Sequence, residues 1–140
     1  MKFIRTTATE KILNLRKRIR GVAGGTSASK TISILLWCIH HAQTHKNLII
    51  SVVSESFPHL KRGAIRDFLN ITGSDSFRFD DKRWNKTDYT YTFESGSKLE
   101  FFSADQPGKV RGPRRDILFI NEANNITYET YTMLEVRTKD

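Results

Sequence analysis

The sequence predicts a three-layer α/β sandwich with a mostly parallel central sheet and an inserted antiparallel hairpin. Apolar runs rich in β-branched residues alternate with helical patterns along the chain, which is typical of parallel strands joined by helices. Two segments of alternating polarity, with a glycine-containing turn between them, interrupt this order and predict the hairpin. The length of 140 residues suits one domain with a sizeable core.

The first elements lead into a loop of small residues. TATEKILNLRKR predicts a short helix, because Thr7 and Glu10 are spaced as a capping box, and RIRGVA predicts a strand. The strand runs into GGTSASKT, residues 24–31. After this loop, apolar residues recur from Ile32 at i, i+3, i+4 and i+7, which predicts a helix.

The later elements alternate in the same way. NLIISVVS is an apolar, β-rich run typical of a parallel strand buried on both faces. FPHLKRGAIRDFL, with Pro58 near its start, predicts a helix. DYTYTFE and KLEFFSA predict the two strands of the hairpin, joined by a turn in ESGSK. DILFINEA predicts a buried strand that ends in polar residues, and ITYETYTMLEVR predicts a last helix.

Basic residues are concentrated in two places. The formal net charge is +8; residues 1–20 hold seven basic side chains against Glu10, and KVRGPRR at 109–115 holds four. Two basic clusters on a nearly neutral body favour a polyanionic partner, either nucleic acid or nucleotide phosphates. The alternative is that these are solvated charges that aid solubility.

The composition excludes several classes of protein. A single cysteine, Cys38, rules out an internal disulfide and a cysteine-based metal cluster. The longest apolar stretch, ISILLWCI, is too short to span a bilayer, and the N-terminus lacks the apolar core of a signal peptide. We therefore expect a soluble intracellular protein with no membrane partner.

The loop GGTSASKT has the composition of a phosphate-binding loop, G-x-x-x-x-G-K-[ST], with Ser29 in place of the second glycine. Such a loop needs small residues whose backbone N–H groups converge on the anion, a lysine for the outer phosphates and a hydroxyl for Mg²⁺. The predicted site residues are Gly24, Gly25, Thr26, Ser27, Ala28, Ser29, Lys30 and Thr31. The alternative is a small-residue turn that happens to precede a helix.

A second motif has the chemistry to complete such a site. ILFINE is an apolar strand that ends in a carboxylate, so Glu122 is the candidate general base or water-orienting residue. In nucleotide hydrolases of the additional-strand type, the residue before this carboxylate is usually an aspartate that binds Mg²⁺ through water, and here it is Asn121. Its amide can accept a hydrogen bond from metal-bound water or from Thr31, although it brings no negative charge. The alternative is a plain strand end with Glu122 in solvent.

Together, GGTSASKT and LFINEANNI, with SADQPGKVRGPRRD between them, resemble the ATPase domain of phage terminase large subunits. This is a P-loop NTPase fold of the additional-strand type. The likeness extends from Ile19 to Lys139: VVSESFPHLKRGAIRDF looks like the family's second strand and following helix, and YETYTMLEVRTK like the helix after its acidic strand. A serine before the loop lysine is common in that family, so the resemblance makes Ser29 a family variant.

The resemblance implies an ATP-hydrolysing motor that translocates double-stranded viral DNA into a procapsid, with ATP and Mg²⁺ as cofactors. It implies a homo-oligomeric ring docked on a portal protein, a terminase small subunit as a further partner, and the host cytoplasm as location. It also implies that residues 1–140 are a partial ATPase domain, truncated on its C-terminal side, with the C-terminal nuclease domain absent.

Motors of this kind use an arginine, from the same or a neighbouring subunit, to stabilise charge on the transferring phosphoryl group. Arg111, Arg114 and Arg115 lie just upstream of the acidic strand, and we take Arg111 as the catalytic candidate. The alternatives for these arginines are contacts with DNA phosphates or exposure to solvent.

Other functions remain open from the sequence. The chain could be another nucleic-acid-stimulated P-loop ATPase, such as a helicase, or a nucleotide- or DNA-binding fragment without turnover. A purely structural protein with a fortuitous loop is a third possibility. Loss of nucleotide affinity on removal of Lys30 separates this last case from the others.

Overall fold

The computed structural model describes residues 28–73, 79–112, 114–121 and 125–138. Its helical segments, in chain order, are α2 (Ala28–Thr44), α3 (Phe57–Leu60), the π-helical turn η1 (Lys61–Ile65), α4 (Arg66–Thr72), the 3₁₀ turn η2 (Asp81–Arg83), α5 (Pro107–Val110) and α6 (Tyr128–Val136). Its strands are β1 (Ile49–Ser54), β2 (Trp84–Asn85), β3 (Thr90–Thr92), β4 (Lys98–Ser103) and β5 (Ile117–Ile120). The predicted first helix and the strand RIRGVA lie outside the described residues.

The described strands form one five-stranded sheet in the order β2-β3-β4-β1-β5. β1 is central and pairs in parallel with both β4 and β5, so that Val52 lies opposite Phe101 on one side and Phe119 on the other. β3 pairs antiparallel with β2 and with β4. The predicted α/β sandwich with parallel central strands and an antiparallel hairpin is confirmed. The second strand of the hairpin is itself one of the central strands.

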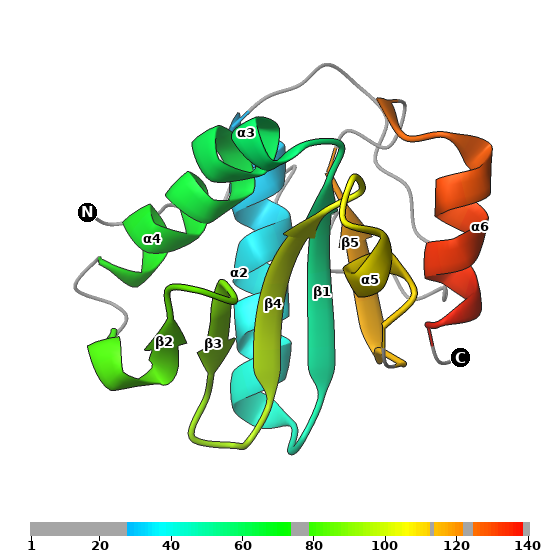
Figure 1. Ribbon diagram of the computed structural model, residues 1–140. Helices are drawn as coiled ribbons and strands as arrows, with labels where there is room; N and C mark the ends of the chain where they lie inside the picture. The colour runs from blue at the N-terminus through cyan, green and yellow to red at the C-terminus, as the bar shows by residue number, and fades with distance from the viewer. Residues whose placement is uncertain (1–27, 74–78, 113, 122–124, 139–140) are drawn as a thin grey trace.

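The central strands lie between two layers of helices (Figure 1). Their side chains alternate between two apolar clusters, one on each face of the sheet. Val52 and Phe101 face the layer formed by α2, α3 and α4, and belong to the larger cluster. Val53 and Phe102 face the opposite way and pack with α5 and α6, where Leu134 is fully buried. The sheet is therefore covered by helices on both faces, which explains why its strands carry apolar residues in consecutive positions.

The short antiparallel strands are held to the sheet by aromatic packing. Phe68 on α4 is fully buried, and its ring centroid lies 5.7 Å from that of Trp84, 5.9 Å from Tyr91 and 5.2 Å from Phe101. These three partners come from β2, β3 and β4. One side chain therefore links three strands to the helical layer.

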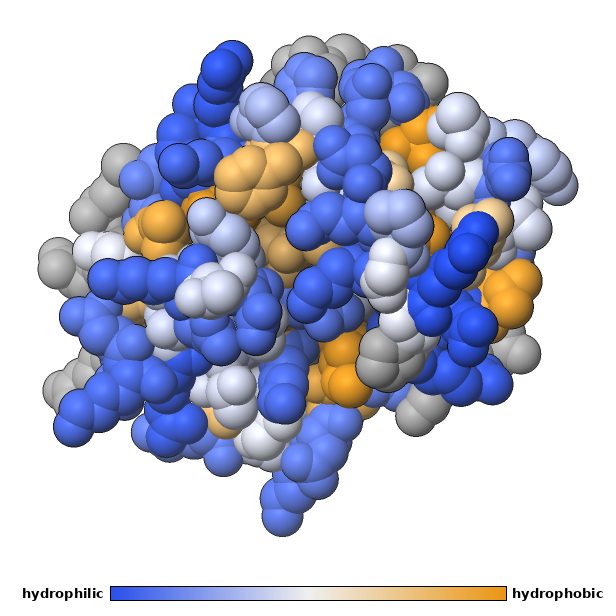
Figure 2. All heavy atoms as spheres, in the orientation of Figure 1, coloured by the Kyte–Doolittle hydropathy of each residue, from blue (hydrophilic) through white to orange (hydrophobic). Residues whose placement is uncertain are grey.

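The face of the molecule in Figure 2 is predominantly hydrophilic, and its apolar side chains form separate patches rather than one continuous surface. Tyr128 and Val136 on α6 are among the exposed large apolar residues. Among the described helices, none has both the length and the apolar composition needed to cross a membrane.

A buried arginine fastens α5 and α6 to the sheet. The Arg115 side chain is 1% exposed and precedes β5. Its guanidinium donates to Ser51 Oγ at 3.1 Å, to the Leu134 carbonyl at 3.1 Å and to the Lys109 carbonyl at 3.4 Å. Ser51 in turn donates to Glu100 Oε1 at 2.5 Å. Burial lowers the pKa of Arg115, while the nearby Glu100 carboxylate opposes that shift.

We predict that Arg115→Ala lowers the free energy of unfolding by about 3 kcal/mol or more, because it leaves a cavity and several buried acceptors without their donor. Arg111→Ala is the matched control, since this neighbouring arginine is exposed, and its effect should stay within about 0.5 kcal/mol. Urea denaturation measures both values. Equal effects of the two substitutions would contradict the structural role of Arg115.

Cys38 lies in the core on α2, and burial raises the pKa of its thiol from 9.0 to about 12. In the unfolded chain the thiol ionises near its ordinary value, so between these two pKa values only the unfolded state loses the proton. Stability contributed by the neutral thiol is therefore complete below about pH 9 and is lost as the pH rises toward 12.

We predict that the wild-type chain loses stability over this alkaline range faster than Cys38→Ala, by up to about 1.4 kcal/mol per pH unit. Urea unfolding from pH 8 upward measures the difference, because other titrating groups are shared by the two chains. Parallel stability curves would show that the thiol ionises equally in both states.

Candidate functional site

The site lies at one edge of the sheet, where the parallel strands β1, β4 and β5 end. Because parallel strands place their carboxyl ends at the same edge, Ser54, Ser103 and Asn121 are brought together there. α2 begins at this edge and runs back along the sheet (Figure 1). The carboxyl edge of an open α/β sheet is the usual place for ligands in such folds.

A hydrogen bond links the start of α2 to the end of β5. The Asn121 backbone N–H donates to the Val53 carbonyl at 2.8 Å, which continues the β1–β5 ladder and fixes the position of this residue. The Thr31 hydroxyl donates to Asn121 Oδ1 at 3.3 Å, and both side chains are half-buried. Lys30, in the same first turn of α2, is also half-buried. The fold thus joins two motifs that are far apart in the sequence.

The chemistry of this contact suits an anion with a hard cation. The first turn of a helix carries partial positive charge and backbone N–H groups, which favour phosphate. Thr31 and Asn121 present oxygen atoms, the ligand type that Mg²⁺ prefers, and a threonine hydroxyl that donates to Asn121 keeps its lone pairs for a metal. No described residues form a cluster of three or more His, Cys, Asp or Glu side chains around a metal position.

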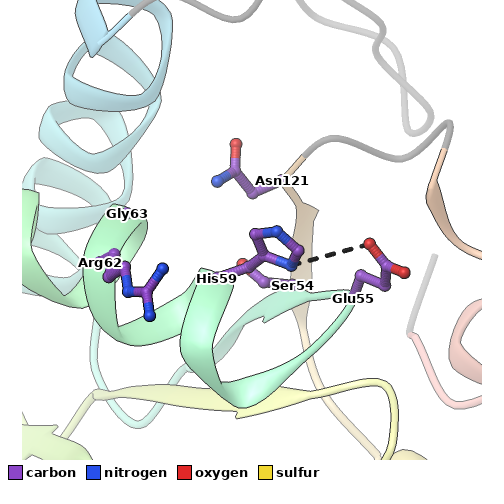
Figure 3. A pocket seen from close by; sticks show the side chains of 6 residues that line it. All are labelled: Ser54, Glu55, His59, Arg62, Gly63 and Asn121. Carbon is purple, nitrogen blue, oxygen red and sulfur yellow. Dashed lines mark ion pairs between the residues drawn. The ribbon is translucent and has the colours of Figure 1, made fainter.

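A hollow of about 180 Å³ lies beside Asn121, on the side of β1 and α3 (Figure 3). It is lined by Ser54, Glu55, His59, Arg62, Gly63 and Asn121. Apart from Asn121, these residues were not among those predicted from the sequence. The available signal was the serine at the end of a buried strand, since a polar residue in this position lies at the same edge as Asn121.

The other predicted site residues are placed as follows. Ala28 and Ser29 are the first residues of α2, whereas Gly24, Gly25, Thr26, Ser27 and Glu122 lie outside the described residues. Arg111 is exposed at the C-terminal end of α5, on the face of the sheet opposite α2. Arg115 is buried at the amino end of β5, at the edge away from Asn121, so its guanidinium serves the fold and not a phosphate.

Comparison with solved structures finds the same fold in a viral protein. The chain matches two crystal forms of the large terminase from a thermophilic bacteriophage, with TM-scores of 0.63 and 0.66 at 15% and 16% sequence identity. The matches cover 81% and 94% of this chain but only 28% and 34% of the terminase chain, so this chain spans about a third of its length. No protein-family model and no curated protein sequence matches the chain.

We predict that the Thr31–Asn121 hydrogen bond couples the two residues energetically. Thr31→Val keeps the shape of the side chain but removes the donor, and should cost about 1 kcal/mol of stability. In a double-mutant cycle with Asn121→Ala, the coupling should be about 0.5–1.5 kcal/mol. Urea denaturation of the four chains measures it. Additive effects would show that α2 and β5 are not linked through this contact.

Proposed function

We propose that the chain is the nucleotide-binding part of an ATP-hydrolysing motor of the large-terminase class, which translocates double-stranded viral DNA into a procapsid. The observation that carries the proposal is the hydrogen bond from Thr31 to Asn121, at the carboxyl edge of a sheet whose fold is like that of the bacteriophage large terminase. It joins the end of the phosphate-binding motif to the end of the acidic strand. These are the two elements that a P-loop site must bring together.

In this proposal the start of α2 binds the phosphates of ATP. The motif at residues 24–29 would supply backbone N–H groups to the anion, and the Lys30 ammonium binds the outer phosphate oxygens. The Thr31 hydroxyl and the Asn121 amide hold the metal site, directly or through water. Mg²⁺ would supply positive charge that offsets the negative charge of the phosphates.

Glu122 is the proposed base of the reaction. It directly follows Asn121, which the β1–β5 ladder fixes at the carboxyl edge. The carboxylate orients a water molecule in line with the terminal phosphorus and accepts its proton as the new P–O bond forms and the bond to ADP breaks. Lys30 stabilises the charge that gathers on the leaving phosphate oxygens.

Arg111 is proposed to act on a neighbouring subunit. Because α5 and α2 cover opposite faces of the sheet, this exposed arginine lies on the face away from α2 in its own chain. A ring of subunits would bring it to the site of the next copy. Arg114, also exposed, is the second candidate for this role.

The partners follow from the same proposal. The net charge of +8 suits a duplex DNA substrate, because phosphate neutralisation dominates the affinity of such proteins. Within the proposed motor, residues 1–140 are part of the ATPase domain of one subunit in a homo-oligomeric ring. The ring would act with a portal protein and a terminase small subunit in the host cytoplasm.

A second candidate function is nucleotide binding without turnover. Asn121 favours it, because an amide brings no negative charge to the metal position where an aspartate usually stands. Weak Mg²⁺ binding would let the site hold phosphates without cleaving them. A helicase-like ATPase has no comparable observation in its favour, since both solved structures named above are large terminases.

We predict that the chain binds ATP and hydrolyses it faster in the presence of duplex DNA. Lys30→Ala should weaken ATP binding by at least about tenfold, because charge-assisted contacts to phosphate are lost. Lys46→Ala is the matched control, since Lys46 is an exposed lysine beyond the opposite end of α2, and it should leave affinity unchanged. Calorimetric titration measures binding, and phosphate release measures turnover.

Glu122→Gln separates the motor from the binding module. If the chain is an ATPase, this substitution preserves ATP affinity and reduces turnover by about 100-fold or more. A wild-type chain that binds ATP but hydrolyses it no faster than Glu122→Gln would establish binding without turnover. If Lys30→Ala bound ATP as tightly as the wild-type chain, the proposed nucleotide site at the start of α2 would be wrong.

A further inference from the structure

Two serines at the carboxyl edge differ in how their hydroxyls are satisfied. Ser54 ends β1 and Ser103 ends β4, directly opposite each other in the register. The Ser103 hydroxyl donates to the Asp105 carboxylate. The Ser54 hydroxyl is buried, with the residue 2% exposed, and has no hydrogen-bond partner among the described residues. A buried hydroxyl without a partner is costly, so such a group calls for a ligand.

The Ser54 side chain lines the hollow beside Asn121, and Arg62 and Gly63 contribute a further wall (Figure 3). This wall is η1, a π-helical turn, and such turns are frequent at functional sites. A Cβ placed on Gly63 in η1 would lie 3.7 Å from Asn121 Nδ2, in ordinary van der Waals contact. The η1 turn therefore neighbours the same Asn121 amide that accepts from Thr31.

The hollow contains one guanidinium, that of Arg62, one carboxylate, that of Glu55, and the imidazole of His59. His59 Nδ1 lies 2.8 Å from Ser56 Oγ and 3.7 Å from the Glu55 carboxylate, so Nε2 is the ring nitrogen available to a ligand. The Glu55 carboxylate lies beside the imidazole of His59. Arg62 adds a guanidinium from the first turn of η1, and its planar donors match the oxygens of phosphate.

We propose that this hollow, referred to below as the Ser54 pocket, binds a tetrahedral phosphate oxyanion. Ser54 and the Asn121 amide donate hydrogen bonds, the Arg62 guanidinium supplies the positive charge, and His59 Nε2 is a further polar group of the wall. Its volume of about 180 Å³ exceeds the roughly 30 Å³ that one water occupies, which leaves room for such an anion. The identity of the source rests on the proposed function, because the phosphate would come from ATP, either as its terminal group or as the free product.

The test is to measure the binding of inorganic phosphate to the whole chain by calorimetry or by ³¹P line broadening. Arg62→Gln should weaken binding about tenfold or more, because a charge-assisted contact is lost, and Ser54→Ala should weaken it several-fold. Lys61→Gln is the matched control: it removes the same charge one residue away, from an exposed side chain that does not line the pocket, and should change affinity less than twofold.

A second measurement separates the two sources. If the pocket holds the terminal phosphate of bound ATP, Arg62→Gln also weakens the binding of a non-hydrolysable ATP analogue. If it holds the released product, analogue affinity is unchanged, and inhibition of turnover by added phosphate is relieved in the variant.

Stability separates a ligand role from a packing role. Ser54→Ala should leave the urea midpoint unchanged or raise it, because no hydrogen bond is lost, whereas Ser103→Ala should lower it. A lowered midpoint for Ser54→Ala would show that its hydroxyl has a partner in the fold and would remove the main argument for the pocket.

The proposal is overturned if the wild-type chain binds no phosphate, or if Arg62→Gln and Lys61→Gln weaken binding equally. Failure of the wild-type chain to bind ATP, with phosphate still bound at the Ser54 pocket, would overturn the proposed function and leave the oxyanion site standing. The two failures are therefore distinguishable.

Discussion

The parallel pairing of β1 with β4 and β5 is the constraint on which the rest of the structure depends. It fixes Asn121 beside Val53, and Ser54 opposite Ser103, so that the polar ends of β1, β4 and β5 lie at one edge. α2 then needs only to begin at that edge for Thr31 to reach Asn121. A shift of one residue in the β1–β5 register would turn the strand over and carry Asn121 away from α2.

The register is secured at the opposite edge of the same strands. Asp116 exchanges two hydrogen bonds with Ile49, its backbone N–H donating to the Ile49 carbonyl and its carboxylate accepting from the Ile49 N–H, each at 2.8 Å. The preceding residue, Arg115, donates hydrogen bonds to Ser51 Oγ and to the Leu134 carbonyl near the end of α6. The basic cluster before β5 therefore divides in function. Its last arginine anchors the strand from within, while Arg111 and Arg114 remain exposed.

Much of this arrangement can be predicted from the sequence because it follows from local patterns. The apolar run of β1, the helical spacing in α2 and the polar end of β5 each indicate an element and its orientation, and from these the meeting of Thr31 with Asn121 follows. The central position of β4 is harder to predict, because the alternation of Leu99 and Phe101 with polar neighbours indicates the strand of a hairpin with one apolar face. The adjacent Phe102, buried on the other face, was the sign of a central strand.

The Ser54 pocket could not be predicted, because it depends on tertiary contacts. A π-helical turn has no distinctive composition, and the approach of Gly63 to Asn121 depends on how η1 packs over the end of β1. Whether a serine hydroxyl at a strand end finds a partner is also decided by the neighbouring loops. Ser103 has Asp105 beside it, and Ser54 has no such acceptor in the described part of the chain.

The most direct test of the account is an isotope-edited NMR titration of the chain with Mg²⁺ and a non-hydrolysable ATP analogue. If the start of α2 and the end of β5 form one nucleotide site, the largest shifts fall together on the Lys30 and Thr31 amides and on the side-chain amide of Asn121. Saturable binding that leaves Asn121 unmoved while signals elsewhere shift would contradict it.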